Sequence, residues 1–230
     1  MLMSKSCHDL DYLSYLVDRP CLRVSSFGAL SFFRRDQAPP GSTDRCTDPC
    51  PVEPGCPYSA LQAYVHSKLT EWPADVGSRE HSFEAHLQAI RTGPYGRCVW
   101  KCDNDVVDHQ TVNLQFADDV TATFTMTAFT LNGARLLRVH GTQGEIRFDE
   151  RGITLNTFAD RNVQQFTLGA ELGGHSGGDV RVVHEWLLAL HSRDDSQVVA
   201  NAQESLKTHT IVFAAEQSRR EGRQVAIAEL

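Results

Sequence analysis

The clearest pattern in this chain is a strict alternation of apolar and polar residues between residues 112 and 128. The apolar positions are Val112, Leu114, Phe116, Val120, Ala122, Phe124, Met126 and Ala128, around a turn at Asp118-Asp119. Threonines occupy the alternate positions 121, 123, 125 and 127. Because successive side chains of a strand point to opposite faces, the alternation predicts an antiparallel hairpin with one buried face.

Shorter apolar runs on both sides of this hairpin predict further strands. One is expected over 21–33, which is rich in Val, Phe, Leu and Ser. Four more are expected over 136–140, 145–149, 153–157 and 163–168, because turn-forming residues separate them. The middle of the chain is therefore predicted to be a β-meander.

Apolar residues at helical spacing predict helices near both ends of the chain and between the first strand and the hairpin. The expected ranges are about 7–18, 59–68, 82–91, a helix that begins at Asp179, and a last helix from Asn201 to Glu221. Ser6 with Asp9 and Asn201 with Glu204 have the form of capping boxes, and Gly222 follows the last helix. Asp179 is the expected N-cap of its helix.

Helices at both ends of a central meander predict an α+β fold. We expect a large, mostly antiparallel open β-sheet with helices packed on one face, in a single domain over 1–230. Six of the nine prolines and three of the seven cysteines fall between Pro39 and Pro57, so 34–57 is expected to be an irregular Pro/Cys-rich loop. The uncovered sheet face is expected to be solvated or paired with another subunit.

Composition narrows the classes of partner. The formal net charge is -7 and no run of five basic residues occurs, so a nucleic-acid partner is not expected. No apolar stretch reaches the roughly 18 residues of a membrane span, and the N-terminus lacks the apolar segment of a signal peptide. We therefore expect a soluble, cytoplasmic protein without a membrane partner, and seven cysteines, an odd number, disfavour a complete disulfide framework.

The cysteines of the irregular loop suggest a metal site. Cys46, Cys50 and Cys56 form the pattern C-x3-C-x5-C in a segment too irregular to build its own core. Zinc takes four soft or imidazole ligands, and the candidates for a fourth are Cys7, His8, Cys98 and Cys102. Free thiols and a disulfide are the alternatives, and Cys7, at a predicted helix N-terminus, is expected to be the most reactive thiol.

Several stretches resemble the C-terminal domain of the Gfo/Idh/MocA oxidoreductases. They are Lys-Ser-Cys-His-Asp-Leu-Asp at 5–11, Cys-Pro-Tyr-Ser-Ala at 56–60, Tyr-Gly-Arg-Cys at 95–98, Cys-Asp-Asn-Asp-Val-Val-Asp-His-Gln at 102–110, Gly-His-Ser-Gly-Gly-Asp at 174–179, and the closing segment 204–223. The resemblance covers essentially the whole chain. It implies kinship with NAD(P)-dependent dehydrogenases that act largely on sugars and inositols.

Members of that family begin with a Rossmann domain that this sequence lacks. No Gly-x-Gly-x-x-Gly fingerprint and no Glu-Lys-Pro segment occur in the chain. The resemblance therefore implies NAD or NADP in a full-length relative, whereas this chain alone is expected to bind neither and to be inactive. A shortened gene product or the C-terminal half of a longer protein would explain the absence.

The resemblance also implies site residues at the start of the chain. His8 stands where the family places a catalytic histidine beside the reacting carbon, and in a first helical turn its imidazole would tend to stay neutral. The alternative is that His8 has no catalytic role and is a polar residue that helps to cap the helix start. Ser4 stands where many members carry an aspartate. Lys5 is expected to donate to substrate hydroxyls, and a solvated lysine is the alternative.

Four further residues are expected to bind substrate. His175 and Asp179 flank a glycine-rich loop that opens a helix, where exposed N–H groups can bind hydroxyls or anions. Arg97 and His109 are expected, with Asp105, on one face of a single strand if no bulge intervenes, and this face would line the substrate cleft or, alternatively, a subunit contact.

Together these features predict the C-terminal substrate-binding and oligomerisation domain of an NAD(P)-dependent oxidoreductase. A sugar-like small molecule is the expected ligand, and a homo-oligomer is expected to form through the sheet face. The competing hypothesis is a non-catalytic binding or scaffold module that is clipped by zinc through its cysteine loop.

Overall fold

A computed structural model describes residues 1–131, 133–149, 151–169, 175–196, 198 and 200–230. The chain forms two compact units. The first comprises Met1–Ala128 with Phe213–Leu230, and the second comprises Phe129–Val212. Among the described residues, no helix has the length and apolar character needed to cross a membrane.

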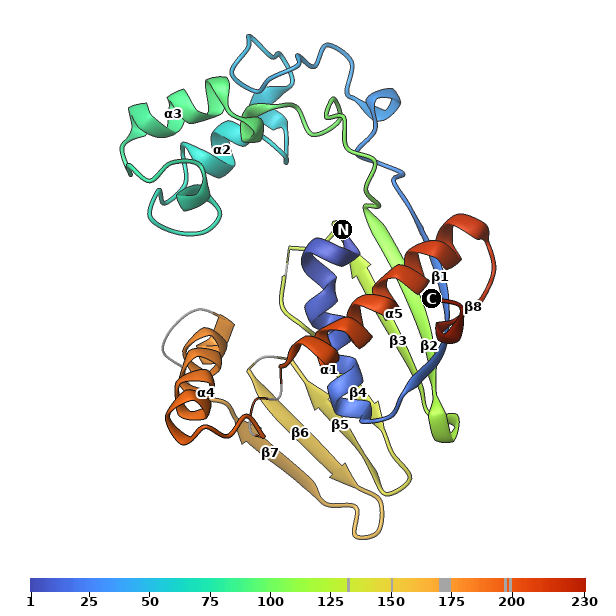
Figure 1. Cartoon of the computed structure of the whole chain (residues 1–230). Coiled ribbons are helices and arrows are strands. Elements are labelled where there is room, and N and C mark those ends of the chain that lie inside the picture. The colour runs from blue at the N-terminus through green and yellow to red at the C-terminus, as the bar shows by residue number, and fades with distance from the viewer. Residues whose placement is uncertain (132, 150, 170–174, 197, 199) are drawn as a thin grey trace. The chain divides into compact units, whose positions relative to one another are not determined.

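The first unit is built on a four-stranded antiparallel sheet in the order β3-β2-β1-β8 (Figure 1). The strands are β1 (Cys21–Ala29), β2 (His109–Phe116), β3 (Thr121–Thr127) and β8 (Val225–Ala226). The predicted hairpin is confirmed, because Val112 pairs with Phe124 and Leu114 with Ala122. These side chains alternate with the threonines, so one face of the sheet is apolar and the other polar.

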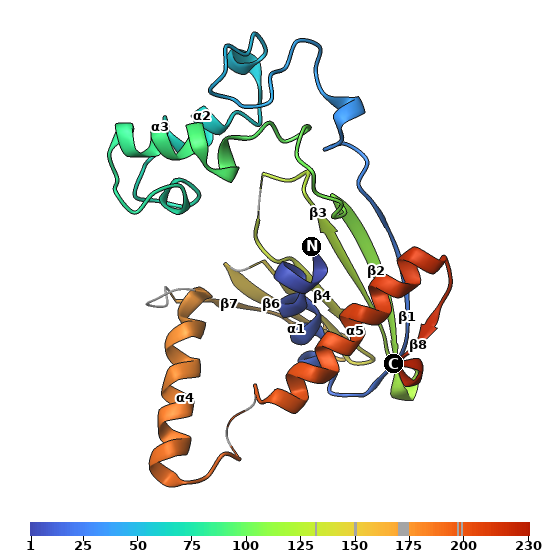
Figure 2. The same ribbon diagram turned by 45° about the horizontal axis from the view of Figure 1, so that its top comes forward.

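Two helices cover the apolar face. Helix α1 (Cys7–Val17) and the C-terminal half of α5 (Ala202–Glu221) lie on the same side of this sheet in both views (Figures 1 and 2). The fully buried apolar side chains between the layers are Leu10, Val24, Val112, Phe116, Ala214, Ala215 and Val225. The predicted α+β class, with helices on one face of an antiparallel sheet, is therefore confirmed, although the strands in the described part of the chain form two sheets of four rather than one large sheet.

A buried polar contact fixes α5 on the sheet. The Ser218 hydroxyl accepts the N–H of Ser26 at 2.9 Å, and the Gln110 amide donates to the Ser26 hydroxyl at 2.9 Å. All three residues are buried. Because an unpaired polar group in this position would cost on the order of 1–3 kcal/mol, the contact sets the position of the helix along β1.

The helix starts differ in part from the prediction. A π-helical turn (Leu2–Ser6) runs directly into α1, and the Ser6 side chain makes no capping bond. The predicted capping box at Ser6 is therefore wrong, because the chain is already helical there. At α5 the Asn201 side chain does accept from the N–H groups of Gln203 and Glu204, each at 3.0 Å, and Gly222 ends the helix at φ 65°.

A long connection joins β1 to β2 and carries two short helices; this segment, residues 30–108, is the excursion of the first unit. The helices are α2 (Ala60–Tyr64), shorter than predicted, and α3 (Phe83–Thr92), and serine hydroxyls of Ser59 and Ser82 cap both. A small core of Ala60, Val65 and Ile90 joins them. The loop over 34–57 is irregular as predicted, with single 3-10 turns at Arg35–Gln37 and Glu53–Gly55.

The second unit contains the predicted meander. Its strands β4 (Leu137–His140), β5 (Gly144–Phe148), β6 (Gly152–Thr157) and β7 (Val163–Thr167) pair in sequence order, all antiparallel. Helix α4 (Gly178–Ser192) follows, with Gly177 at its N-cap. The prediction of Asp179 as N-cap is wrong, because Gly177 takes the left-handed conformation there (φ 84°) and Asp179 lies inside the first turn.

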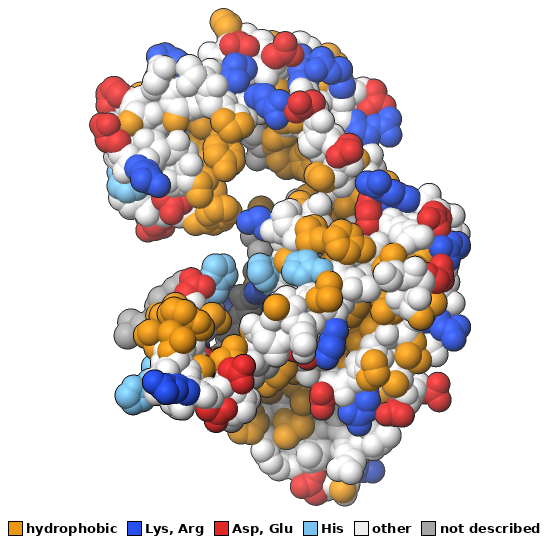
Figure 3. All heavy atoms as spheres, in the orientation of Figure 1, with side chains coloured by type: hydrophobic (Ala, Val, Ile, Leu, Met, Phe, Trp, Pro, Cys, Tyr) orange, Lys and Arg blue, Asp and Glu red, His pale blue; other side chains and the backbone are white. Residues whose placement is uncertain are grey.

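Helix α4 exposes its apolar side chains. None of its described residues is buried, and Figure 3 shows apolar side chains gathered over it. The exposed apolar residues are Val180, Val182, Val183, Trp186, Leu187, Leu188 and Leu190. The sequence pattern thus predicted the helix correctly, but its apolar face is open.

The buried carboxylate of Asp108 joins the two ends of the excursion. Its side chain is 2% exposed, and it accepts the N–H of Ser31 at 2.9 Å, the N–H of Phe32 at 2.7 Å and Nδ1–H of His109 at 2.8 Å. Burial by itself would raise the pKa of this carboxyl, but these hydrogen bonds outweigh it and hold the pKa at about 2. The segment after β1 is thereby attached to the start of β2.

We predict that Asp108→Asn lowers the free energy of unfolding by about 2 kcal/mol at pH 7, because a pKa near 2 instead of 3.8 corresponds to that much stabilisation of the charged form. The folded-state pKa is the lower one, so this stabilisation is present above pH 4 and is lost as the pH falls towards 2. Urea denaturation at pH 7 and at several values between 4 and 2 measures it. Asp118→Asn, which removes an exposed partner of Arg19, is the control and should change stability by less than about 1 kcal/mol. Equal effects of the two substitutions would contradict the role given to Asp108.

Candidate functional site

Lys5 and His8 lie together at the start of the chain. Both are exposed, with Lys5 in the π-helical turn and His8 in the first turn of α1, three residues further on. The premise that His8 and Cys7 stand at a free helix N-terminus is wrong, because helical backbone extends back to Leu2. The field of the helix end therefore acts on the residues before Lys5, and the His8 imidazole is exposed to solvent.

His175 and Asp179 form a pair at the start of α4. Nδ1 of His175 lies 2.9 Å from Oδ1 of Asp179, and both side chains are exposed. The predicted glycine-rich loop lies partly outside the described residues, since 170–174 are not among them. The carboxylate orients the imidazole, so the pair presents a ring nitrogen and a carboxylate oxygen side by side.

Arg97 and Asp105 do not share a strand face with His109, so this prediction is wrong. Strand β2 begins only at His109, and Arg97 makes a single antiparallel bridge with Arg45 in the cysteine loop. Nη1 of Arg97 lies 2.7 Å from Oδ1 of Asp103. This hydrogen bond raises the pKa of Arg97 and lowers the pKa of Asp103. One edge of the guanidinium is therefore occupied within the chain.

His109 is the candidate residue whose orientation is best defined. Its Nδ1 donates to buried Asp108, which leaves Nε2 available, and its side chain is 46% exposed. It lies on the polar face of the sheet with Thr111 and Asn113. Sequence analysis did not single out Asp108, although a carboxylate directly after Val106-Val107 at a strand start is an available signal of a buried acceptor.

Four aromatic rings pack together near Asp108. Sequence analysis did not single out this cluster either. Phe33 and Tyr58 have ring centroids 5.1 Å apart, and Tyr58 and Trp100 have centroids 5.4 Å apart. Phe32, whose N–H is held by Asp108, completes the cluster. The Trp100 ring is buried, and its Nε1–H has no acceptor among the described residues. Asp108 thus positions an aromatic cluster as well as His109.

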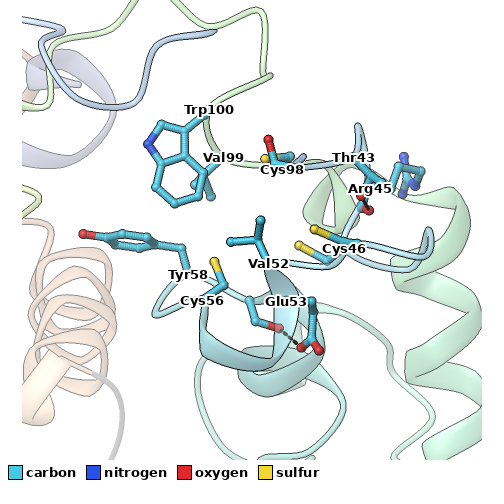
Figure 4. Close-up of a pocket in the computed structure, with 13 residues that line it drawn as sticks. Thr43, Arg45, Cys46, Val52, Glu53, Cys56, Tyr58, Cys98, Val99 and Trp100 are labelled. Carbon is cyan, nitrogen blue, oxygen red and sulfur yellow. Dashed lines mark hydrogen bonds between the residues drawn. The ribbon is translucent and has the colours of Figure 1, made fainter. Parts of the chain in front are cut away.

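Four cysteines line one small cavity beside Tyr58 and Trp100 (Figure 4). Cys46, Cys50, Cys56 and Cys98 surround a volume of about 20 Å³, so Cys98, and none of Cys7, His8 and Cys102, joins the three predicted residues. Burial raises the pKa of the Cys46 and Cys56 thiols. At Cys50 burial acts in the same direction, but hydrogen bonds with the backbone of Thr43 and Val52 outweigh it and lower the pKa.

The thiols are free in this arrangement. All seven cysteines are unpaired, and among the described residues no three His, Cys, Asp or Glu side chains are arranged to hold a metal ion. The predicted zinc ligands Cys46, Cys50 and Cys56 are therefore neighbours around a cavity without being a formed ligand set.

Comparison with solved structures shows the same fold in several oxidoreductases. Levoglucosan dehydrogenase in complex with NADH and levoglucosan is 15% identical, with a TM-score of 0.61 over 97% of this chain and 49% of that chain. An oxidoreductase domain protein from Kribbella flavida is 14% identical, with a TM-score of 0.59 over 98% of this chain and 51% of that chain. Aldose-aldose oxidoreductase from Caulobacter crescentus, complexed with glycerol, is 13% identical, with a TM-score of 0.54 over 98% and 47%.

This chain spans about half the length of each of these proteins. No curated protein matches it. A family model described as "Oxidoreductase family, C-terminal alpha/beta domain", named for Gfo/Idh/MocA, matches residues 1–227. The chain therefore belongs to the Gfo/Idh/MocA oxidoreductase family and corresponds to its C-terminal domain.

Proposed function

We propose that this chain is the substrate-binding and oligomerising half of an NAD(P)-dependent oxidoreductase that acts on a sugar or polyol. The observation that carries the proposal is the family match over residues 1–227, in a chain that spans half the length of similar oxidoreductases. The names of two of those oxidoreductases refer to levoglucosan and to aldoses, which supports a polyhydroxylated substrate. The dinucleotide would be bound by additional protein, since this sequence has no Gly-x-Gly-x-x-Gly fingerprint.

Within this proposal His8 moves the proton of the reacting hydroxyl and Lys5 donates to a neighbouring oxygen. Their exposure and their spacing of three residues on one helical segment support the pairing. His109 in the first unit, with Nε2 available, and the pair of His175 and Asp179 in the second unit are each proposed as donors or acceptors for substrate hydroxyls. Arg97 has N–H groups beyond the one that Asp103 engages, so it stays in the proposed set.

The open apolar face of α4 supports a need for additional protein. Monomeric soluble proteins rarely expose a contiguous apolar patch of this kind, because its burial is favourable. Val183, Trp186 and Leu190 are each more than half exposed. We further propose a cytoplasmic location, which the odd number of cysteines supports.

The DNA immediately upstream of this coding sequence provides the test of the dehydrogenase proposal. We predict that it encodes, in frame, a Gly-x-Gly-x-x-Gly strand-turn-helix and a Glu-Lys-Pro segment, and that the longer polypeptide oxidises a sugar or polyol with NAD(P)+. His8→Asn in that polypeptide should lower kcat at least about 100-fold with little change in KM, since general acid–base groups contribute about that much. His140→Asn, on an exposed strand of the second unit, is the matched control and should leave kcat unchanged.

The following outcomes would contradict parts of this proposal. The present chain alone should bind no NADH or NADPH in a fluorescence titration, and micromolar binding would contradict the division of labour proposed. Equal activity of His8→Asn and His140→Asn would remove His8 from the mechanism. An upstream region without such a domain would favour the competing hypothesis of a non-catalytic binding or scaffold module.

The polar face of the first sheet is the proposed surface for self-association. Phe27 stands on it, 68% exposed, beside Thr111 and Thr125 of the neighbouring strands. In a two-fold symmetric interface each residue is present on both subunits, so a charge at Phe27 would be brought near its own copy.

We predict that the chain sediments as a dimer or larger oligomer at micromolar concentration and that Phe27→Asp shifts it to monomer. Repulsion between like charges and the loss of aromatic contact area both act in this direction. Phe158→Asp, at an exposed turn of the second unit, is the control and should leave the oligomer intact. A monomeric parent chain, or dissociation by both substitutions alike, would exclude this face as the interface.

A further inference from the structure

The Pro/Cys-rich loop over 34–57 follows a defined path without a hydrophobic core. No residue between Arg34 and Pro57 is buried. Polar contacts to the rest of the excursion hold it, such as the Arg45 guanidinium on the carbonyl of Ile90 at 2.6 Å. Long irregular segments need a stabilising element of their own, and apolar burial does not supply one here.

Backbone pairing brings Cys46 and Cys98 to the same side of a short two-stranded contact. Arg45 and Arg97 form the bridge, with the N–H of Cys46 on the Gly96 carbonyl at 3.0 Å and the N–H of Cys98 on the Asp44 carbonyl at 2.9 Å. The two cysteines are therefore diagonal neighbours, a relation in which Cα atoms lie roughly 7–8 Å apart. That is longer than an unstrained disulfide allows, and it suits two ligands of one ion.

Turns in the loop bring the other two thiols to the same cavity. The N–H of Glu53 donates to the Cys50 carbonyl at 3.2 Å, and the N–H of Cys56 donates to the Glu53 carbonyl at 3.0 Å. All four cysteines then line the cavity of about 20 Å³, with Arg45 also in its wall (Figure 4). A volume of this size holds about one water-sized particle.

We propose that Cys46, Cys50, Cys56 and Cys98 bind one zinc ion as four thiolates. Each thiol gives up its proton to solvent on binding, and the four sulfurs complete the tetrahedron at about 2.3 Å that structural zinc takes. The thiols must rotate into the cavity to do so, because no three of the described candidate ligands are yet spaced for one ion. One contact already favours a thiolate here, because the N–H of Ala60 donates to Sγ of Cys46 at 3.4 Å.

The role of this site is structural and separate from the proposed dehydrogenase function. Zinc would cross-link the loop to the segment that carries Trp100 and leads to Asp108 and His109. Zinc binding therefore stabilises the excursion, and this stabilisation does not depend on NAD(P)H or on a sugar.

Titration of the reduced, chelator-treated full chain with ZnCl2 against a chromophoric chelator tests the proposal. We expect one zinc per chain, bound at least ten-fold more weakly after Cys98→Ser, and a rise in Tm on zinc addition that the variant lacks. Cys102→Ser is the matched control, since Cys102 lies four residues from Cys98 and does not line the cavity. Cobalt in place of zinc gives sulfur-to-metal absorption bands that report four thiolates in the parent chain, whether or not the variant folds.

Failure to bind zinc at micromolar concentration would overturn the site. So would equal binding by the parent and Cys98→Ser chains, or a disulfide between two of the four cysteines in the chain purified without reductant.

Discussion

The arrangement of the first unit depends on one buried carboxylate. Asp108 collects the backbone N–H groups that leave β1 and the imidazole that begins β2, and the strength of these bonds is expressed in its low pKa. The ladder between β1 and β2 extends to the pair of Ala29 and His109, and the Asp108 side chain continues this attachment to the residues that follow β1. The same bonds position the Phe32 ring and His109.

The adjacent residues Asp108 and His109 thus have different roles. Asp108 is buried and structural, whereas His109 stands on the polar sheet face with Nε2 available. On the opposite face the Ser26, Gln110 and Ser218 contact attaches α5. These buried hydrogen bonds therefore fix the register of elements whose apolar packing would tolerate sliding, because breaking them would leave buried polar groups unpaired.

Periodic patterns predicted most of the elements, because alternation and helical spacing are local properties of the chain. The hairpin of β2 and β3, the meander and the helices all follow from them. The start of α1 did not, since a π-turn before Ser6 leaves no distinctive residue type in the sequence. The segment from Arg97 to Asp108 was predicted to be part of a strand, but only Arg97 pairs, in a single bridge with Arg45 of the cysteine loop, and composition does not encode such a long-range contact.

The same limit applies to the candidate site and explains which of its parts were found. The family resemblance pointed to His8, Lys5 and His175, but only the fold showed that Asp108 orients His109 and which of the candidate fourth ligands lies with the loop cysteines, namely Cys98. An apolar stripe also does not say what it packs against. Val183 and Leu190 predict a helix equally well whether their partner lies in this chain or in another protein, and the structure leaves them exposed.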